Sequence, residues 1–356
     1  MRNSIFVLFT LLILTCLVQA NEGTISPCSL VPYSVDYSPI TKKLYAACSG
    51  SAETLTLSVI DPFTLQQEAY FTFNGLIHKV SPVDNGNALI VALSKIVGAT
   101  TEESGLLLKV DYDTGEILNS LEFSKTILAM VVNPSETHAF LTQGLGTMQT
   151  KLVSKVNLAN FEVSSVEFGN CSDEIKITNN GQKIYVKDHQ NYGQTMTEFK
   201  FHVGIFRTSD LQPLGPLEID TSPFSMEMGY DNRLYIFNFA PGRSSEDAIT
   251  IVNTQNDTVI KTIKFADHDG PGIEFAGIDP IRHKLYGTVC EVDPQLYPRC
   301  TNKIIQINLD DPNYSHSFFT LGNEPLWMIA VASTQSRCRI FCTPDEGTLI
   351  HWVDEN

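Results

Sequence analysis

Five residues have side chains that could bind a divalent cation or move a proton. Asp267, His268 and Asp269 fall together in the stretch DHDG, Glu274 follows closely, and Asp173 lies farther back in the chain. Carboxylate oxygens and imidazole nitrogens are common ligands of divalent cations, and a carboxylate can also act as a general base. A solvated polar loop explains the same residues as simply. The choice depends on the fold that positions them.

Catalytic signatures do not accompany these residues. The sequence lacks the motifs H-E-x-x-H, G-x-S-x-G, G-x-x-x-x-G-K-[ST] and C-x-x-C. The stretch DYDTGE, residues 111–116, begins like a calcium loop, but its glycine comes one place early and the distal acidic ligand is missing. We therefore expect a turn there. No cofactor is evident beyond the candidate divalent cation.

The elements that must position these residues come from an internal repeat. An apolar pair recurs, and subtracting its successive second positions gives intervals of 45, 50, 45, 50, 51 and 55 residues. The pairs are Leu44-Tyr45, Leu89-Ile90, Ala139-Phe140, Ile184-Tyr185, Leu234-Tyr235, Leu285-Tyr286 and Ile340-Phe341. Each unit contains four short runs rich in β-branched and aromatic residues, separated by turn residues, which indicates an antiparallel sheet. Seven such sheets predict an all-β fold, a seven-bladed β-propeller of four-stranded antiparallel blades.

The ends of the chain predict how the ring closes. After TLIHWV, residues 348–353, the sequence ends at Asn356 without a fourth strand for the last unit. The stretch EGTISPCSL, residues 22–30, precedes the first strand of the first unit. We expect it to complete the last blade as its outer strand, because this pairing removes an exposed sheet edge. Residues 21–356 would then form a single domain.

Three phrases of the repeat resemble a known group of propellers. LTLSVIDPFTLQQEAYFTF, LLLKVDYDTGEILNSLEF and AITIVNTQNDTVIKTIKF are similar to the third-strand, turn and fourth-strand phrases of YVTN-type seven-bladed propellers, with lactonase-like propellers as relatives in style. The resemblance covers all seven units and implies the fold. It leaves the activity open, because this architecture hosts scaffolds, sugar-lactone hydrolases and electron-transfer enzymes.

Propeller geometry predicts a ligand site at one end of the central channel. The loops that enter the first strands and the loops between second and third strands share one face. Aligning the units on their apolar pairs places these residues near that mouth: Tyr33, His78, Leu128, Asp173, Phe224, Glu274 and Trp327. The aromatic rings and carboxylates could hold a sugar, an amine or a hydrated cation. Mixed side chains and water would line the mouth of a propeller that binds nothing there.

The N-terminus predicts export. Residues 1–20 contain Arg2, an apolar run from Ile5 to Leu14 and a small-residue exit at Ala20, which is typical of a cleaved signal peptide rather than a membrane span. Removing them takes away Arg2 and no acidic residue, so the formal charge moves from -16 to -17. Such acidity argues against nucleic acid or an anionic membrane as partner. We expect a secreted, extracellular protein, with the endolysosomal lumen as the alternative.

Glycosylation sequons and cysteines fit the same compartment. Sequons begin at Asn170, Asn256 and Asn313. The cysteines after residue 20 are odd in number: Cys28, Cys48, Cys171, Cys290, Cys300, Cys338 and Cys342. We expect a Cys290–Cys300 disulfide across one loop, while Cys28–Cys48 stays open. Cys338 and Cys342 cannot bridge in an extended strand, because about 13 Å would separate their Cα atoms.

Two functions remain after these exclusions. The first is an extracellular binding or recognition protein for a protein or glycan partner, which the missing catalytic signatures and the long polar loops favour. The second is a lactonase-like or other hydrolase with a metal or carboxylate at the channel mouth. In that case Asp173 and Glu274 are the candidate ligand or general base.

Overall fold

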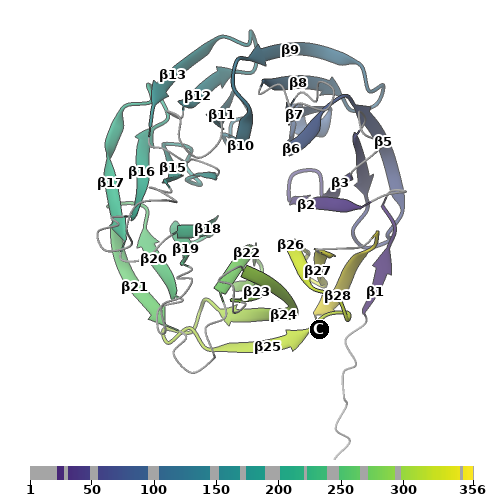
Figure 1. Ribbon diagram of the computed structural model, residues 1–356, viewed down its shortest axis with the longest axis vertical. Helices are drawn as coiled ribbons and strands as arrows, with labels where there is room; N and C mark the ends of the chain where they lie inside the picture. Colours follow the sequence, from purple (N-terminus) through teal and green to yellow (C-terminus); the bar gives the residue numbers. More distant parts are fainter. Residues whose placement is uncertain are drawn as a thin grey trace, which may run out of the picture.

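Seven blades surround a central channel. The computed structural model describes residues 22–27, 31–48, 55–94, 104–144, 152–168, 174–188, 201–219, 223–238, 248–264, 272–292, 298–344 and 348–355. Within these residues the strands form seven sheets of four strands each, arranged in a ring (Figure 1). The expected all-β, seven-bladed propeller is confirmed. We number the blades 1 to 7 in the order of their inner strands.

Each blade has an inner, a second, a third and an outer strand. The inner strands are β2 (Pro32–Ser38), β6 (Leu76–Val83), β10 (Ile127–Val132), β14 (Ile175–Ile177), β18 (Pro223–Met228), β22 (Gly272–Asp279) and β26 (Leu326–Ser333). The second strands are β3 (Lys43–Cys48), β7 (Ala88–Ser94), β11 (His138–Gln143), β15 (Lys183–Asp188), β19 (Arg233–Asn238), β23 (Lys284–Val292) and β27 (Cys338–Pro344).

The third and outer strands complete the blades. The third strands are β4 (Leu55–Ile60), β8 (Gly105–Asp111), β12 (Leu152–Asn157), β16 (Phe201–Arg207), β20 (Ala248–Asn253), β24 (Pro298–Asn308) and β28 (Ile350–Glu355). The outer strands are β5 (Gln67–Phe73), β9 (Ile117–Phe123), β13 (Val163–Glu167), β17 (Pro213–Ile219), β21 (Thr258–Lys264), β25 (His316–Thr320) and β1 (Glu22–Ile25). A short 3-10 turn, η1 (Asp84–Gly86), follows β6.

The repeated apolar pairs form the core between the blades. No member of the seven pairs is more than 3% exposed. Successive side chains of a strand point to opposite faces of the sheet, so one member of each pair faces the preceding blade and the other the following blade. Tyr45 thus shares a hydrophobic cluster with Leu89, and the alternation continues around the ring until Phe341 meets Leu44. The repeat therefore recurs once per blade because each blade needs one such pair to contact its two neighbours.

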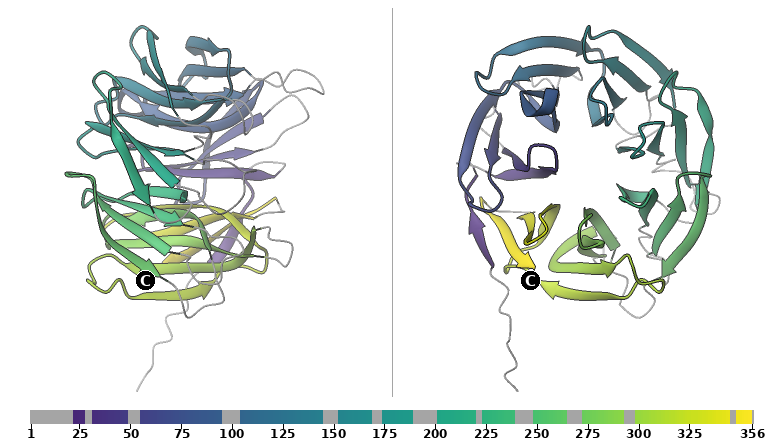
Figure 2. Two further views of the ribbon diagram at one scale, coloured as in Figure 1. Left: turned by 60° about the vertical axis from the view of Figure 1, so that its left-hand side comes forward. Right: turned by 180° about the vertical axis from the view of Figure 1, so that it is seen from behind.

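The N-terminal strand closes the ring, as expected. β1 is the outer strand of blade 7 and pairs antiparallel with β28, with Glu22 opposite Val353 and Ile25 opposite Ile350. Figures 1 and 2 show this strand beside the C-terminal strands of the chain. Gly23 lies under the ring of Trp352, where an added Cβ would come within 2.7 Å of the indole. Glycine is therefore required at this position for the two strands to pair so closely.

Basic residues join neighbouring blades. A lysine or arginine directly precedes the apolar pair in five blades, as Lys43, Lys183, Arg233, Lys284 and Arg339. Four of these side chains reach the next blade: Lys183 to Asp257, Arg233 to the Tyr314 hydroxyl, Lys284 to Glu355, and Arg339 to the carbonyl oxygens of Pro62 and Phe63. We call these contacts interblade latches. Lys43 instead pairs with Asp61 and Glu68 of its own blade.

The cysteines divide into bonded and free residues. Cys290 and Cys300 stand opposite each other on β23 and β24 and form a disulfide. Cys48 is also disulfide-bonded. Cys338 and Cys342 are buried, free and both on β27. The signal peptide expected at residues 1–20 lies outside the described residues. Across the described ranges, no helix is long and apolar enough to cross a membrane.

Replacing Arg339 with Met will test the contacts that this residue makes within blade 7 and across to blade 1. The Arg339 side chain is 4% exposed, and its Nε lies 2.5 Å from Asp354 Oδ1. Its guanidinium also stacks on Trp352, 3.9 Å from the ring centre. Arg339→Met leaves the largely buried Asp354 with only the more distant Arg337, at 3.8 Å, and removes the donor to the Pro62 and Phe63 carbonyl oxygens. We therefore expect the free energy of unfolding to fall by about 3 kcal/mol.

Urea unfolding will measure this loss, with Arg207→Met as the matched control. Arg207 makes the same two-pronged contact with Asp210, but both side chains are nearly half exposed. Exposed pairs contribute little, so the control will unfold close to the wild-type midpoint. Equal losses in the two variants would contradict a structural role for Arg339.

Candidate functional site

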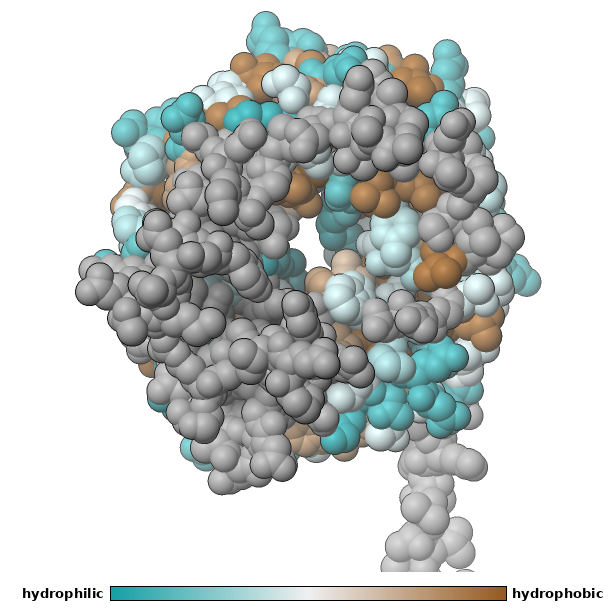
Figure 3. All heavy atoms as spheres, in the orientation of Figure 1, coloured by the Kyte–Doolittle hydropathy of each residue, from teal (hydrophilic) through white to brown (hydrophobic). Residues whose placement is uncertain are grey.

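The ring has two distinct faces. The loop face is the end at which the inner strands begin, and it includes Tyr33, His78 and Trp327. The turn face is the opposite end, where short turns such as residues 39–42 and 133–137 lead from inner to second strands. Figure 3 views the molecule along the axis of the ring and shows an opening through it.

Tyr33 joins blades 1 and 2 at the loop face. Its hydroxyl donates to the Ile77 carbonyl oxygen at 2.8 Å and accepts from the Ile77 amide at 3.0 Å. Burial raises the pKa of the Tyr33 phenol, although the bond to the Ile77 backbone opposes this rise. Because both hydrogen-bonding roles of the hydroxyl are occupied within the protein, Tyr33 can offer a ligand mainly the side of its ring.

His78 forms a close contact with a serine that the sequence did not single out. His78 Nε2 lies 2.5 Å from Oγ of Ser94, the last residue of β7. Burial lowers the pKa of His78 from its ordinary 6.5 to about 4, so the imidazole is neutral at pH 7. A neutral imidazole beside a hydroxyl is the arrangement that activates serine nucleophiles. No sequence signal singles out Ser94, because only the fold brings it beside His78.

The structure describes the remaining predicted mouth residues only in part. The Trp327 ring lies 5.7 Å from that of Phe275, between blades 7 and 6. Leu128 is half-buried on β10. Phe224 and Glu274 belong to β18 and β22, but their side chains are outside what the structure describes. Asp173, Asp267, His268 and Asp269 also lie outside the described residues, so the predicted cation site stays a prediction.

Charged residues of the inner strands are paired across blade boundaries. Asp36 on β2 forms an ion pair with Lys79 on β6. On the other side of the ring, Lys176 Nζ lies 2.8 Å from Glu227 and 3.5 Å from Glu174. Burial alone would lower the pKa of Lys176, but the two glutamates and, more weakly, Asp36 raise it above its usual value. Both pairs join neighbouring blades, but Asp36–Lys79 is more than a third exposed and contributes less than the more buried Lys176–Glu227 pair.

Sequence reasoning missed this charged lining, although the repeat contained the signal. Each inner strand has one residue paired with the second member of the apolar pair, and these seven are Asp36, Ser81, Val131, Lys176, Glu227, Gly277 and Ala330. Three of the seven are charged. Comparing the position three residues after each aligned mouth residue would have revealed them.

A groove opens on the turn face across blades 1, 2 and 3. Its volume is about 230 Å³. The walls are mainly apolar, with Asp36, Lys79 and Glu136 as charged residues, and the apolar lining includes Pro39, Ile40, Pro82, Val132 and Pro134. Ile40 is 54% exposed. Pro39, Ile40 and Pro134 are exposed and Pro82 is buried, so the groove presents a small apolar surface that a partner could contact.

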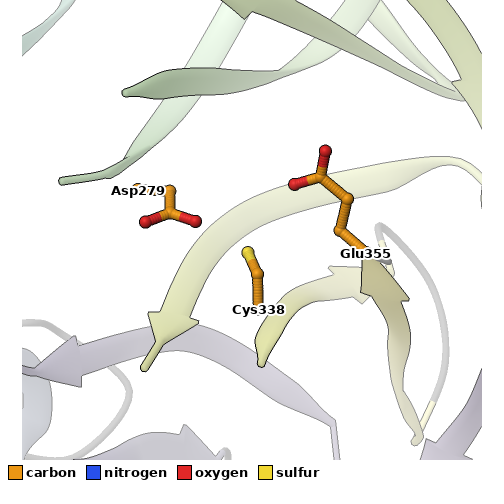
Figure 4. Close-up of side chains that lie close together, drawn as sticks. All are labelled: Asp279, Cys338 and Glu355. Carbon is orange, nitrogen blue, oxygen red and sulfur yellow. The ribbon is translucent and has the colours of Figure 1, made fainter. Parts of the chain in front are cut away.

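Asp279, Cys338 and Glu355 form a buried cluster between blades 6 and 7 (Figure 4). One ligand atom from each lies within 4.8 Å of the others, a spacing that suits a metal ion. However, Asp279 Oδ2 accepts from Arg282 at 3.1 Å, and Glu355 pairs with Lys284.

The charges in this cluster oppose a dication. Burial alone would raise the pKa of Asp279, but hydrogen bonds from the Arg282 and Ile281 amides hold it low. Burial, and then Asp279 itself, raises the pKa of the Cys338 thiol, which stays protonated. A divalent cation would have to displace two basic side chains and a thiol proton. We therefore assign the cluster to the latch between these blades.

Comparison with known proteins supports the fold. No protein-family model matches the chain, and no curated protein is similar to it in sequence. A chain of Kuenenia stuttgartiensis hydrazine synthase is similar in structure, with TM-score 0.70, 10% identity, and 94% of this chain and 99% of that chain covered. A chain of a mitotic checkpoint complex gives 0.69 at 10% identity, with 99% of both chains covered. The WD40 domain of Toxoplasma gondii coronin gives 0.65 at 13%, covering 94% and 85%.

The pH dependence of stability will test the burial of His78. Because the folded-state pKa is lowered, the unfolded chain takes up a proton first as the pH falls below about 6.5. The stability contributed by neutral His78 is complete above that pH and is lost towards pH 4. A lowering from 6.5 to about 4 corresponds to about 3 kcal/mol.

We will measure the unfolding midpoints of His78→Gln and Ser94→Ala from pH 7.5 to 4. The two profiles will distinguish the effect of His78 on the pH dependence of stability from that of Ser94. We expect His78→Gln to flatten the acid-side loss of stability, because the titrating group is gone. Ser94→Ala keeps a buried imidazole, so its profile will keep the wild-type slope. An unchanged slope in His78→Gln would mean that His78 is solvated.

Proposed function

We propose that this protein is a secreted recognition protein whose propeller binds a protein or glycan partner. The observation that carries this proposal is the turn-face groove, which offers an exposed apolar surface with charged residues at its edge. The structural neighbours include a chain from an assembly, the mitotic checkpoint complex. Kinship with the YVTN-type and lactonase-like propellers is part of the proposal and rests on the repeat phrases.

The chemistry of the channel supports binding rather than turnover. Among the described inner-strand residues, Asp36, Lys79, Lys176 and Glu227 are held in ion pairs across the blades. Groups that are fixed in this way stabilise the ring and are not poised to transfer protons. An acidic, exported propeller suits an extracellular partner, and the N-terminal sequence supports export.

The lactonase-like or other hydrolase remains as a second candidate function because of one contact. His78 and Ser94 lie within hydrogen-bonding distance at the loop face, and the imidazole is neutral at pH 7. In this alternative Ser94 would attack an ester or lactone carbonyl, and His78 would take the hydroxyl proton. A histidine with a pKa near 4 is a weak general base, since the best catalytic pKa lies near the working pH. In this hydrolase, Asp173 and Glu274 remain the candidates for a metal ligand or general base.

Ile40→Asp will test the groove as the binding surface. Immobilised protein will be used to isolate partners from extracellular fluid, and their affinities will then be measured by surface plasmon resonance. Placing a carboxylate on the apolar wall should weaken a groove-bound partner at least tenfold, about 1.4 kcal/mol. Ile281→Asp is the matched control, because Ile281 is 43% exposed in the equivalent turn of blade 6. If a partner binds Ile40→Asp as tightly as it binds the wild-type protein, the groove is not its binding surface.

A fluorophosphonate probe separates the two functions. The reagent reacts with activated serines: Oγ bonds to phosphorus, fluoride leaves, and the base takes the proton. The binding function predicts that wild-type protein is labelled no more than Ser94→Ala. Labelling at Ser94 that disappears in His78→Gln would instead establish an activated nucleophile, and would contradict a purely binding role.

A further inference from the structure

Two sequons occupy equivalent exposed turns on neighbouring blades. Asn256 lies in the turn between β20 and β21 of blade 5, and Asn313 in the turn between β24 and β25 of blade 6. Both residues are exposed. These turns belong to the turn face, because they connect the strand ends that lie beside the turns from inner to second strands. We propose that both asparagines carry N-linked oligosaccharides that together cover the turn face of blades 5 and 6.

The side-chain contacts at Asn256 are compatible with this modification. The Thr258 hydroxyl donates to Asn256 Oδ1 at 2.8 Å. This bond occupies the amide oxygen, whereas the glycan would be attached to the nitrogen Nδ2. At Asn313 the hydrogen bond from the backbone amide to Asp311 Oδ1, 2.8 Å long, shapes the turn without using the side-chain amide.

Both turns are fixed to the body of the ring. Asp257, next to Asn256, accepts from Lys183 Nζ at 2.7 Å and from the Tyr185 hydroxyl at 2.5 Å, both on blade 4. Tyr314, next to Asn313, accepts from Arg233 of blade 5 at 3.1 Å. Lys261 of blade 5 also donates to the Pro312 carbonyl oxygen at 2.9 Å. The glycans would therefore start from two rigid, adjoining positions.

This placement divides the turn face into two halves. The groove lies across blades 1, 2 and 3, whereas the two asparagines lie on blades 5 and 6, across the ring (Figure 1). Glycans are bulky and solvated, so they exclude protein contacts from the surface they cover. The glycan-covered half would be closed to a partner, and the groove half would remain open.

The modification requires a donor from the secretory lumen, so this inference rests on the proposed export. The donor is a lipid-linked oligosaccharyl pyrophosphate. A bond forms between asparagine Nδ2 and C1 of the sugar, while the bond between C1 and the phosphate oxygen breaks. The lipid pyrophosphate leaves with that electron pair, and the amide gives up one proton to a base. The third sequon, at Asn170, lies outside the described residues.

Mass spectrometry of the full chain secreted from cultured animal cells will test the proposal. Peptide N-glycosidase removes N-linked glycans and converts each modified Asn to Asp, which marks the site in peptide spectra. We expect marks at Asn256 and Asn313. Thr258→Ala and Ser315→Ala should each remove one glycan from the intact mass, because each destroys one sequon. The matched controls Thr258→Ser and Ser315→Thr keep the sequons and should retain both glycans.

The outcomes separate this proposal from the proposed export. Protein recovered from the medium with unmodified Asn256 and Asn313 would overturn the glycans and leave export intact. Protein retained in the cytosol would contradict export. In that case the two sites are tested in the same chain with residues 1–20 replaced by the signal peptide of an established secreted protein. Unmodified asparagines in that secreted chain would overturn the proposal, and glycans on both would support it.

Discussion

Every blade of this protein is held by two neighbouring residues that face opposite ways. Because side chains alternate along a strand, the apolar pair of each second strand contributes to the core on both sides of its sheet. Tyr45 packs with Leu89 of the next blade, and Phe341 packs with Leu44 across the seam. No blade can bury its own faces, so the ring is stable only when it is complete. The closing strand β1 belongs to that requirement, since it completes the seventh sheet.

Many polar residues also join neighbouring blades, so they are not available to bind a ligand. The latches use the basic residue before the apolar pair to hold the next blade, as Arg339 does with Pro62 and Phe63. The channel pairs Asp36–Lys79 and Lys176–Glu227 do the same near the axis. These charges stabilise the ring. Among the described residues, the turn-face groove and the His78–Ser94 contact remain as the features that the fold does not require.

The strands and blades could be predicted from the sequence because the repeat reflects local properties of the chain: side-chain alternation in strands and the residue preferences of turns. A strand with an apolar pair must face two neighbours, and the turns between strands have recognisable residues, so the number of blades and the closing strand followed. The site was harder to predict, because it depends on contacts between distant units. Ser94 is ordinary in sequence and becomes notable only beside His78. Asp279, Cys338 and Glu355 meet from different strands of two blades, and their basic partners decide against a metal.

Hydrogen–deuterium exchange along the two strands of the seam tests the closed ring most directly. Amides in a paired strand exchange only when the pairing opens. The account predicts that residues 22–25 and 350–355 exchange as slowly as the outer and third strands of blades 2 and 3. Rapid exchange of residues 22–25 in an otherwise protected protein would show that β1 does not close the ring, and would contradict the architecture on which the proposed binding surfaces depend.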